Sequence, residues 1–306
     1  MNSLAEYHQP VMIYNPTAGK FRRNPGRLVE RATAALRRAG IAPQLLPTYC
    51  AGHATSLARS AVANGSDLVV VLGGDGTINE VANGMAHTGV PLGILPGGTA
   101  NVLATELGLG SRLEWAAKRL AASVPRTLAA GRIVTREGET RYFLMMCGVG
   151  LDARVVHEID PGFKAAFGKL AYWWSGLAQI TRRVEPLEVR VNGAAHGCGF
   201  ALVSRVRNYG GDLEIARGAS LLDDAFEVVT FEGTQALRYA WYMSGVLLRR
   251  VKSMRGVRVL AADAAEVLTD AHLQIDGEYV GRGPAAIEIV PGAVSLLVPP
   301  AYGSAR

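Results

Sequence analysis

Short apolar runs alternate with segments of helical periodicity through the first 122 residues. The run DLVVVL at 67–72 is apolar almost throughout, which is typical of a strand buried on both faces of a sheet. Similar runs predict strands at 11–16 and 90–95, and the prolines of 41–48 favour another extended segment. Apolar residues at helical spacing predict helices at 25–39, 53–64, 77–86, 100–107 and 113–122. This order predicts a parallel sheet with helices on both faces.

The pattern changes near Pro125. After it come short runs that alternate apolar and polar residues, which predict a mostly antiparallel β domain. The runs are RYFLMMC, LEVRV, GFALVS, FEVVTF, VRVL, LQID, AIEIV and VSLLV. Helical patterns at 163–183 and 234–250 interrupt them. We therefore expect an α/β domain at 1–126 and a β-rich domain at 127–292, with a final segment, 293–306, that can return to the first domain.

Composition narrows the kind of partner. The 306 residues suffice for two domains. A net charge of +6 and a pI near 9.4 favour an anionic partner, such as a nucleotide or an acidic membrane surface. The chain has no RNP-like motif, no zinc-ligand spacing and no long Lys/Arg block, so we expect no nucleic acid partner.

Several features indicate a cytoplasmic protein. The three cysteines form no CxxC motif, which is typical of a reduced intracellular chain. The first ten residues lack the basic and apolar regions of a signal peptide. No apolar run approaches 18 residues, so we expect no membrane span.

Two glycine-rich loops each follow a predicted strand. Gly73, Gly74 and Gly76 follow the strand at 67–72, and Gly97 and Gly98 follow the next strand. Glycine lets backbone N–H groups approach an anion closely, and a helix N-terminus favours phosphate. Thr77 is expected to cap the helix after the first loop, while Gly76 opens its turn. Adjacent parallel strands would place both loops side by side, where they could hold a polyphosphate.

Asp75 stands between the glycines of the first loop. A carboxylate beside phosphate is repelled unless a cation lies between them, so Asp75 indicates Mg²⁺. The alternative is a simple tight turn, in which Asp is a common residue. The chain lacks GxxxxGK[ST] and has no GxGxxG after the first strand, so it contains neither a P-loop nor a dinucleotide fingerprint.

Four sequence blocks carry a resemblance to a known family. They are NPTAGK at 15–20, Thr48 with GHA at 52–54, GGDGTINEVANG at 73–84 and PGGTAN at 96–101. The segment 208–229 and DGE at 276–278 extend the match along the chain. The chain resembles the diacylglycerol kinase / sphingosine kinase family of lipid kinases, in its soluble bacterial form. GGDG by itself is shared with NAD kinases and phosphofructokinases.

The resemblance implies an α/β nucleotide-binding domain of the phosphofructokinase/NAD-kinase type and a C-terminal, mostly antiparallel β-sandwich. It places the active site in a cleft between them and implies transfer of the γ-phosphate of ATP, with Mg²⁺, to a lipid hydroxyl. The implied ATP-binding residues are Asn15, Pro16, Thr17, Ala18, Gly19, Lys20, Thr48, Gly73, Gly74, Asp75, Gly76, Thr77, Ile78, Asn79, Gly97, Gly98, Thr99 and Asn101. Lys20 can equally be a solvated lysine after a turn.

The family's catalytic base matches Glu278. With Asp276 and Asp75 it forms the implied catalytic set, in which a carboxylate accepts the proton of the attacking lipid hydroxyl. The alternative is a β-hairpin turn, because Asp-Gly is a strong hairpin signal.

The resemblance also implies a structural Mg²⁺ site in the segment 220–226. Its ligands would be Asp224 and the backbone carbonyls of Leu221 and Phe226, since oxygen ligands suit Mg²⁺. Asp223 could support the site. The alternative is a surface loop that happens to carry two aspartates.

Three positions depart from the family pattern. Val102 replaces an aspartate after PGGTAN, which weakens the diacylglycerol assignment more than kinase activity. Ala225 replaces the glycine after the aspartate pair, and Arg217 replaces a proline. A non-catalytic lipid- or nucleotide-binding member therefore stays an alternative. An NAD kinase is another, although the chain lacks a GSTAY-like loop.

A lipid substrate requires contact with a bilayer. Residues 163–180 and 239–252 combine aromatic and basic residues in helical patterns, which suit transient contact with the inner membrane face. The alternative is ordinary packing of these helices on the β domain. The acceptor lipid stays open between diacylglycerol and a sphingoid base, and the oligomeric state stays open too, with a homodimer as one option.

Overall fold

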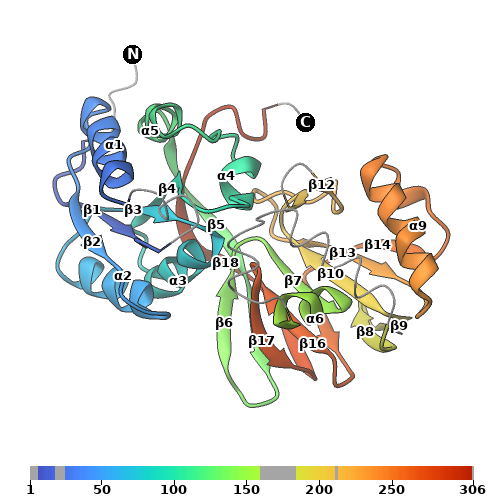
Figure 1. Ribbon diagram of the computed structural model, residues 1–306. Helices are drawn as coiled ribbons and strands as arrows, with labels where there is room; N and C mark the ends of the chain where they lie inside the picture. The colour runs from blue at the N-terminus through green and yellow to red at the C-terminus, as the bar shows by residue number, and fades with distance from the viewer. Residues whose placement is uncertain (1–5, 18–24, 159–183, 211–212, 305–306) are drawn as a thin grey trace. The chain divides into compact units, whose positions relative to one another are not determined.

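The computed structural model of the chain describes residues 6–17, 25–158, 184–210 and 213–304 (Figure 1). It divides the chain into two compact units. Unit 1 comprises Met1–Ala130 and Pro291–Arg306, and unit 2 comprises Gly131–Val290. The sequence placed these boundaries after residues 126 and 292. The chain passes between the units twice, once within β5 (Val124–Thr135) and once within β18 (Ala285–Val298).

Unit 1 contains a parallel sheet. Its strand order is β2-β1-β3-β4, and the C-terminal part of β18 pairs with β4 in parallel. The bounds are β1 Pro10–Tyr14, β2 Gln44–Pro47, β3 Leu68–Gly73 and β4 Pro91–Pro96. Every residue of β3 is buried, as its unbroken apolar run predicts for a strand covered on both faces.

Helices cover both faces of this sheet. Figure 1 shows α1 (Pro25–Arg38) and α5 (Leu113–Ala121) together on one face, and α2 (His53–Ala63) and α3 (Asp75–Met85) on the other. The short α4 (Val102–Glu106) follows β4. Each of these helices buries apolar residues; in α1 these include Ala32 and Leu36 at i, i+4 spacing.

Unit 2 is built from antiparallel strands. One sheet has the order β14-β13-β10-β7-β16-β17. The bounds are β7 Met146–Gly150, β10 Phe200–Ser204, β13 Phe226–Phe231, β14 Val257–Ala262, β16 His272–Ile275 and β17 Glu278–Arg282. The remaining strands are β6 Thr140–Phe143, β8 Leu187–Val191, β9 Ala194–Cys198, β11 Asn208–Gly210, β12 Leu213–Glu214 and β15 Ala264–Val267.

A second layer completes unit 2. The N-terminal part of β18 pairs with β15, which continues to β8 and β9, while β5 pairs with β6. One buried cluster joins the two layers, with Val189 and Ile287 from one and Val203 and Phe226 from the other. The helical segments are α6 Leu151–Glu158, α9 Ala236–Leu247 and a 3₁₀ turn at Val251–Ser253. The predicted fold class, an α/β domain followed by an antiparallel β-sandwich, is confirmed.

Some predicted elements have different bounds. The run RYFLMMC divides into β6 and β7, because the backbone N–H groups of Leu144 and Met145 turn toward Asp276 instead of a neighbouring strand. AIEIV and VSLLV, predicted as two strands, belong to the single strand β18. The helical pattern at 163–183 lies outside the described residues.

Candidate active site

Four loops lie at one edge of the unit 1 sheet, because they follow the carboxyl ends of β2, β1, β3 and β4 in that spatial order. Backbone hydrogen bonds link neighbouring loops. Thr48 N–H donates to the carbonyl of Tyr14 at 2.9 Å, and Gly97 N–H donates to that of Gly73 at 2.9 Å. Asn15 N–H donates to Leu72 across 3.4 Å. The loops around Asn15, Thr48, Gly73 and Gly97 are far apart in the chain but lie along this one edge of the sheet.

The two glycine loops touch through their backbones. A Cβ added to Gly98 would lie 2.4 Å from the Cα of Gly74, and one added to Gly73 would lie 2.9 Å from the Cβ of Thr77. The close approach therefore requires glycine. Asn101 fixes the second loop: its side chain accepts from Gly98 N–H at 2.8 Å and donates to the Gly98 carbonyl at 2.9 Å.

Asp75 is the first residue of α3, with Gly74 as the N-cap. The prediction that Thr77 caps this helix is therefore wrong, since Thr77 lies within the first turn and packs on Gly73. Gly76 likewise lies inside the helix rather than opening its turn. One carboxylate oxygen of Asp75 accepts from Leu103 N–H at 3.4 Å, at the start of α4. Burial raises the pKa of Asp75, and nearby backbone N–H groups, Val102 foremost, only partly offset this.

The other predicted nucleotide residues take several roles. Asn15 Oδ1 accepts from the N–H of Thr17 at 2.9 Å and from its hydroxyl at 2.7 Å, which shapes the turn through Pro16. Ile78 and Asn79 are buried in α3, whereas Thr99 is exposed. Ala18, Gly19 and Lys20 lie outside the described residues.

Part of the sequence motifs serves packing between α2 and α3. Glu80 accepts from Ala54 N–H at 3.1 Å, and its carbonyl accepts from the Thr55 hydroxyl at 2.8 Å. A Cβ on Gly84 would lie 2.4 Å from the Thr55 carbonyl oxygen. The sequence prediction missed this role of Glu80, whose only local signal is its place within the block GGDGTINEVANG.

In unit 2, the DGE segment forms a two-residue β-hairpin turn between β16 and β17. Asp276 and Gly277 have φ values of 49° and 84°, which suits a type I′ turn. The Asp276 carboxylate is buried and accepts from the backbone N–H groups of Leu144 (2.8 Å), Met145 (2.9 Å) and Met146 (3.0 Å). Asp276 therefore holds the β6–β7 connection against the hairpin.

Glu278 is the first residue after this turn and pairs with Ile275 across the hairpin. Its carboxylate is partly exposed, and Oε2 forms an ion pair with Nη2 of Arg141 at 2.9 Å. Sequence reasoning missed Arg141, because β6 and β17 are far apart in the chain. The arrangement leaves a reachable carboxylate whose position is set by the turn and by one arginine.

A series of hydrogen bonds among buried polar side chains supports the hairpin turn. Gly277 N–H donates to Gln274 Oε1 at 2.8 Å, and Gln274 Nε2 donates to Asp152 Oδ2 at 2.6 Å. The Tyr209 hydroxyl donates to the other Asp152 oxygen. A Cβ on Gly148 would lie 1.9 Å from Asp152, so this position excludes larger residues. Asp152 and Gln274 carry no local sequence signal and were not predicted.

Arg205 contacts the loop that is predicted to hold a structural Mg²⁺. The carbonyl of Leu221 accepts from Nη2 of Arg205 at 3.0 Å, and the same nitrogen donates to the Asp223 carbonyl at 3.2 Å. Arg205 is 0% exposed, and its guanidinium would repel a divalent cation at these oxygens. Asp224 is exposed. Arg205 already provides a positive charge at this loop.

Comparison with known proteins finds two domain matches along the chain. Residues 9–133 match the diacylglycerol kinase catalytic domain, and residues 146–298 match the YegS C-terminal NAD kinase beta sandwich-like domain. A diacylglycerol kinase of Bacillus subtilis is 27% identical over 285 residues, covering 89% of this chain and 90% of the relative. One of Mycobacterium tuberculosis is 27% identical, with 88% of each chain covered.

The chain belongs to the family that joins these two domains, and it is a lipid kinase. A crystal structure of a diacylglycerol kinase from Bacillus anthracis strain Sterne has a TM-score of 0.77, covers 97% of this chain and 99% of its own, and is 23% identical. At that identity it supports the fold alone. None of the described helices is both long and apolar enough to cross a membrane.

Proposed function

We propose that the protein transfers the γ-phosphate of ATP to the hydroxyl group of a diacylglycerol or sphingoid-like lipid, with Mg²⁺. The observation that carries the proposal is the contact between the two glycine loops at the edge of the unit 1 sheet. Glycine leaves this backbone without side chains of its own, and the loops adjoin the N-terminus of α3, which suits polyphosphate oxygens.

Asp75 is the proposed Mg²⁺ ligand. A carboxylate beside the phosphate loops fits the way Mg²⁺ binds, with one or two carboxylates and substrate phosphates. When bound, the ion would neutralise phosphate charge. The chain's own part is to hold the carboxylate in place, which Asp75 achieves through its bond to the backbone of α4. Thr48, Asn15 and the residues around them would line the nucleotide.

Glu278 is the proposed base, which accepts the proton of the attacking lipid hydroxyl. Its partial exposure suits contact with a substrate, and Arg141 orients the carboxylate. Asp276 is better placed as a positioning residue, because its carboxylate already accepts three backbone N–H groups. We propose that the protein does this work as a cytoplasmic enzyme at a membrane surface.

The test is phosphorylation of a panel of diacylglycerol, monoacylglycerol, sphingosine, ceramide and NAD, with products read by mass spectrometry. We expect lipid phosphate to form. Asp75→Asn keeps an acceptor for Leu103 N–H but removes the charge, so we expect a loss on the order of 10²-fold in kcat. Glu278→Gln is expected to lower kcat by about 10²–10⁴-fold with little change in the KM for ATP.

Matched controls are Asp263→Asn, an exposed aspartate between β14 and β15, and Glu288→Gln, which is paired with Arg132. Both should retain activity. Phosphorylation of NAD in place of every lipid would overturn the substrate class, and full activity of Asp75→Asn would remove Asp75 from the site.

A further inference from the structure

Helix α9 carries an exposed apolar stripe. Eight large hydrophobic side chains are exposed in the described parts of the chain, and four of them lie between Leu237 and Leu248. Leu237, Trp241 and Leu248 follow one another at i, i+4 and i+11, so they share one face of the helix. Leu237 is 85% exposed and Trp241 is 46% exposed.

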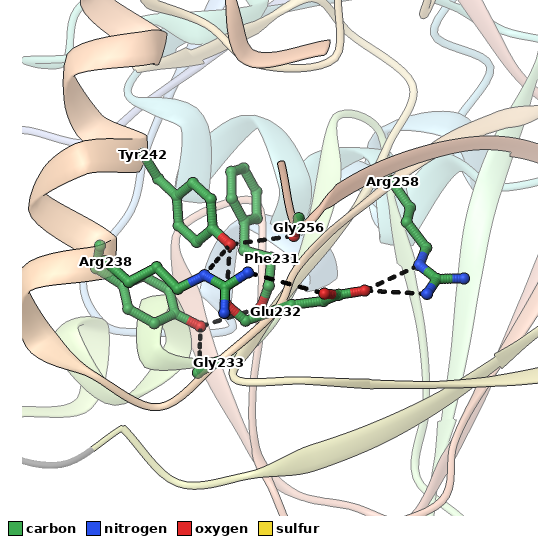
Figure 2. Close-up of polar contacts among 8 residues, drawn as sticks. Phe231, Glu232, Gly233, Arg238, Tyr242, Gly256 and Arg258 are labelled. Atoms are coloured by element: carbon green, nitrogen blue, oxygen red, sulfur yellow. Dashed lines mark hydrogen bonds and ion pairs between the residues drawn. The ribbon is translucent and has the colours of Figure 1, made fainter. Parts of the chain in front are cut away.

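On the opposite face of α9, side chains form hydrogen bonds to backbone groups beside β13 and β14, as Figure 2 shows. The Tyr242 hydroxyl lies 2.9 Å from the carbonyl oxygen of Glu232 and 3.2 Å from that of Gly256, and it accepts from Arg238 Nε at 2.8 Å. The Tyr239 hydroxyl contacts the carbonyl oxygens of Phe231 and Gly233. The helix cannot rotate to bury its outer stripe without breaking these contacts.

A basic segment continues from this stripe. Arg249, Arg250 and Arg255 are exposed, and no ion pair in the described chain involves them. The acidic groups nearby are occupied: Glu232 pairs with Arg238 and Arg258, and Glu227 pairs with Lys252. The surface is therefore apolar along the helix and positive at its end.

Arg249 occupies a position where glycine is usual. It ends α9 with a φ of 56°, and the next residue, Arg250, donates its N–H to the Gly245 carbonyl at 2.7 Å. A residue other than glycine in this conformation costs about 1 kcal/mol or more. The chain retains a charged side chain here despite the cost to the helix end.

We propose that the outer face of α9, formed by Leu237, Trp241, Leu247, Leu248, Arg249 and Arg250, docks on an anionic bilayer. Trp and Leu side chains insert at headgroup depth, while the arginines approach the acidic headgroups. A second copy of this chain fits less well, because a two-fold interface would bring two arginine clusters together. The inference rests on the proposed function, since a lipid kinase must reach a substrate that resides in a membrane.

The test is sedimentation of the full-length protein with vesicles of equimolar phosphatidylglycerol and phosphatidylcholine. The double variant Leu237→Ser/Trp241→Ser should lower the bound fraction constant by roughly tenfold or more, through lost apolar contact. Its control is Trp115→Ser on α5, since Trp115 is 56% exposed. The control should bind as the unmodified protein does.

The charge is tested separately with Arg249→Gly and Arg250→Gln. Each should weaken binding about fivefold, and raised salt should abolish the difference. Arg249→Gly should leave the melting temperature unchanged or raised, because it relieves the left-handed backbone; a structural role would give the opposite result. Arg37→Gln and Arg38→Gln, at the exposed end of α1, are the charge controls.

Two outcomes overturn the proposal: α9 variants that sediment like the unmodified protein, or a dimer in solution that these variants dissociate. Activity on a short-chain diacylglycerol dissolved in buffer separates the two hypotheses. The α9 variants should keep that activity while losing vesicle binding. If the unmodified protein binds vesicles but phosphorylates no lipid, the proposed function fails and the docking surface stands.

Discussion

Some charged side chains of the protein bond to backbone groups. Asp276 accepts three backbone N–H groups, Asp75 accepts one at the start of α4, and Arg205 donates to two carbonyls. Backbone partners fix a loop in place as well as satisfying the charge, because each bond constrains the main chain itself. These charged groups therefore fix loop geometry within each of the two units.

Arg205 leads to a prediction about metal dependence. Because its guanidinium already bonds to the carbonyls of Leu221 and Asp223, the nucleotide-free protein should melt at the same temperature in Mg²⁺ and in EDTA. Arg205→Met should lower the free energy of unfolding by about 3 kcal/mol, since two hydrogen bonds to a charged group are lost. Differential scanning calorimetry measures both effects.

Asp224→Asn serves as the control for Arg205. A metal site would be disclosed if Mg²⁺ raised the melting temperature of the unmodified protein and Asp224→Asn removed that increase. Under the present interpretation Asp224, an exposed carboxylate, contributes little, and the variant should behave as the unmodified protein does at every Mg²⁺ concentration.

At the scale of elements, the contact between the two glycine loops depends on bare backbone. Gly98→Ala would place a Cβ 2.4 Å from the Cα of Gly74, where neither backbone can move without shifting a strand end. Overpacking of this kind costs about 1–3 kcal/mol. We expect lower stability and weaker ATP binding, measured by calorimetry.

The same substitution at Gly197 is the comparison. This residue lies in β9 with nothing within 4 Å of an added Cβ and without a positive φ. Gly197→Ala should leave stability nearly unchanged. Equal ATP affinity in Gly98→Ala and Gly197→Ala would show that the loop contact has no part in nucleotide binding.

Local patterns predicted the elements of unit 1 well. The strand runs and helical periods lie within a few residues of β1 to β4 and α1 to α5, and strand order alone placed the glycine loops at one edge. Contacts distant in sequence could not be predicted this way. Asp276 reaches Leu144 across 132 residues, and Arg141 reaches Glu278 across 137.

Side-chain contacts that the local sequence does not reveal explain where the structure differs from the prediction. Thr77 looked like a helix cap because Ser and Thr favour that position, yet the helix begins two residues earlier and Thr77 fills the space over Gly73. The pair of aspartates at 223 and 224 predicts a metal loop, and this stays a prediction. No local feature disclosed that Arg205, sixteen residues before Leu221, donates to that loop.

At the scale of the whole molecule, unit 1 is not contiguous in the chain. The C-terminal part of β18 pairs with β4 through Ser295 and Leu296, and the Ala293 carbonyl accepts from His87 N–H at 2.8 Å. The Tyr302 hydroxyl adds a hydrogen bond to Glu106 at 3.0 Å. Unit 1 therefore depends on residues that follow unit 2 in the chain.

A chain ended after Val290 should consequently fail to fold its first unit. Four aliphatic side chains would be lost from the core: Val294, Leu296, Leu297 and Val298. At about 1.5–3 kcal/mol each, their burial is comparable with the total stability of about 5–15 kcal/mol that a domain has. Limited proteolysis should cut unit 1 of this shortened chain rapidly, and ATP binding should be absent.

A chain ended after Tyr302 is the matched control, because it retains β18 and the bond to Glu106 and removes exposed residues such as Gly303 and Ser304. It should resist proteolysis and melt as the full chain does. If the two shortened chains behaved alike, unit 1 would fold without β18, and the sheet order would have to end at β4. Because unit 1 includes the C-terminal part of β18, it can complete its fold only after unit 2 has been synthesised.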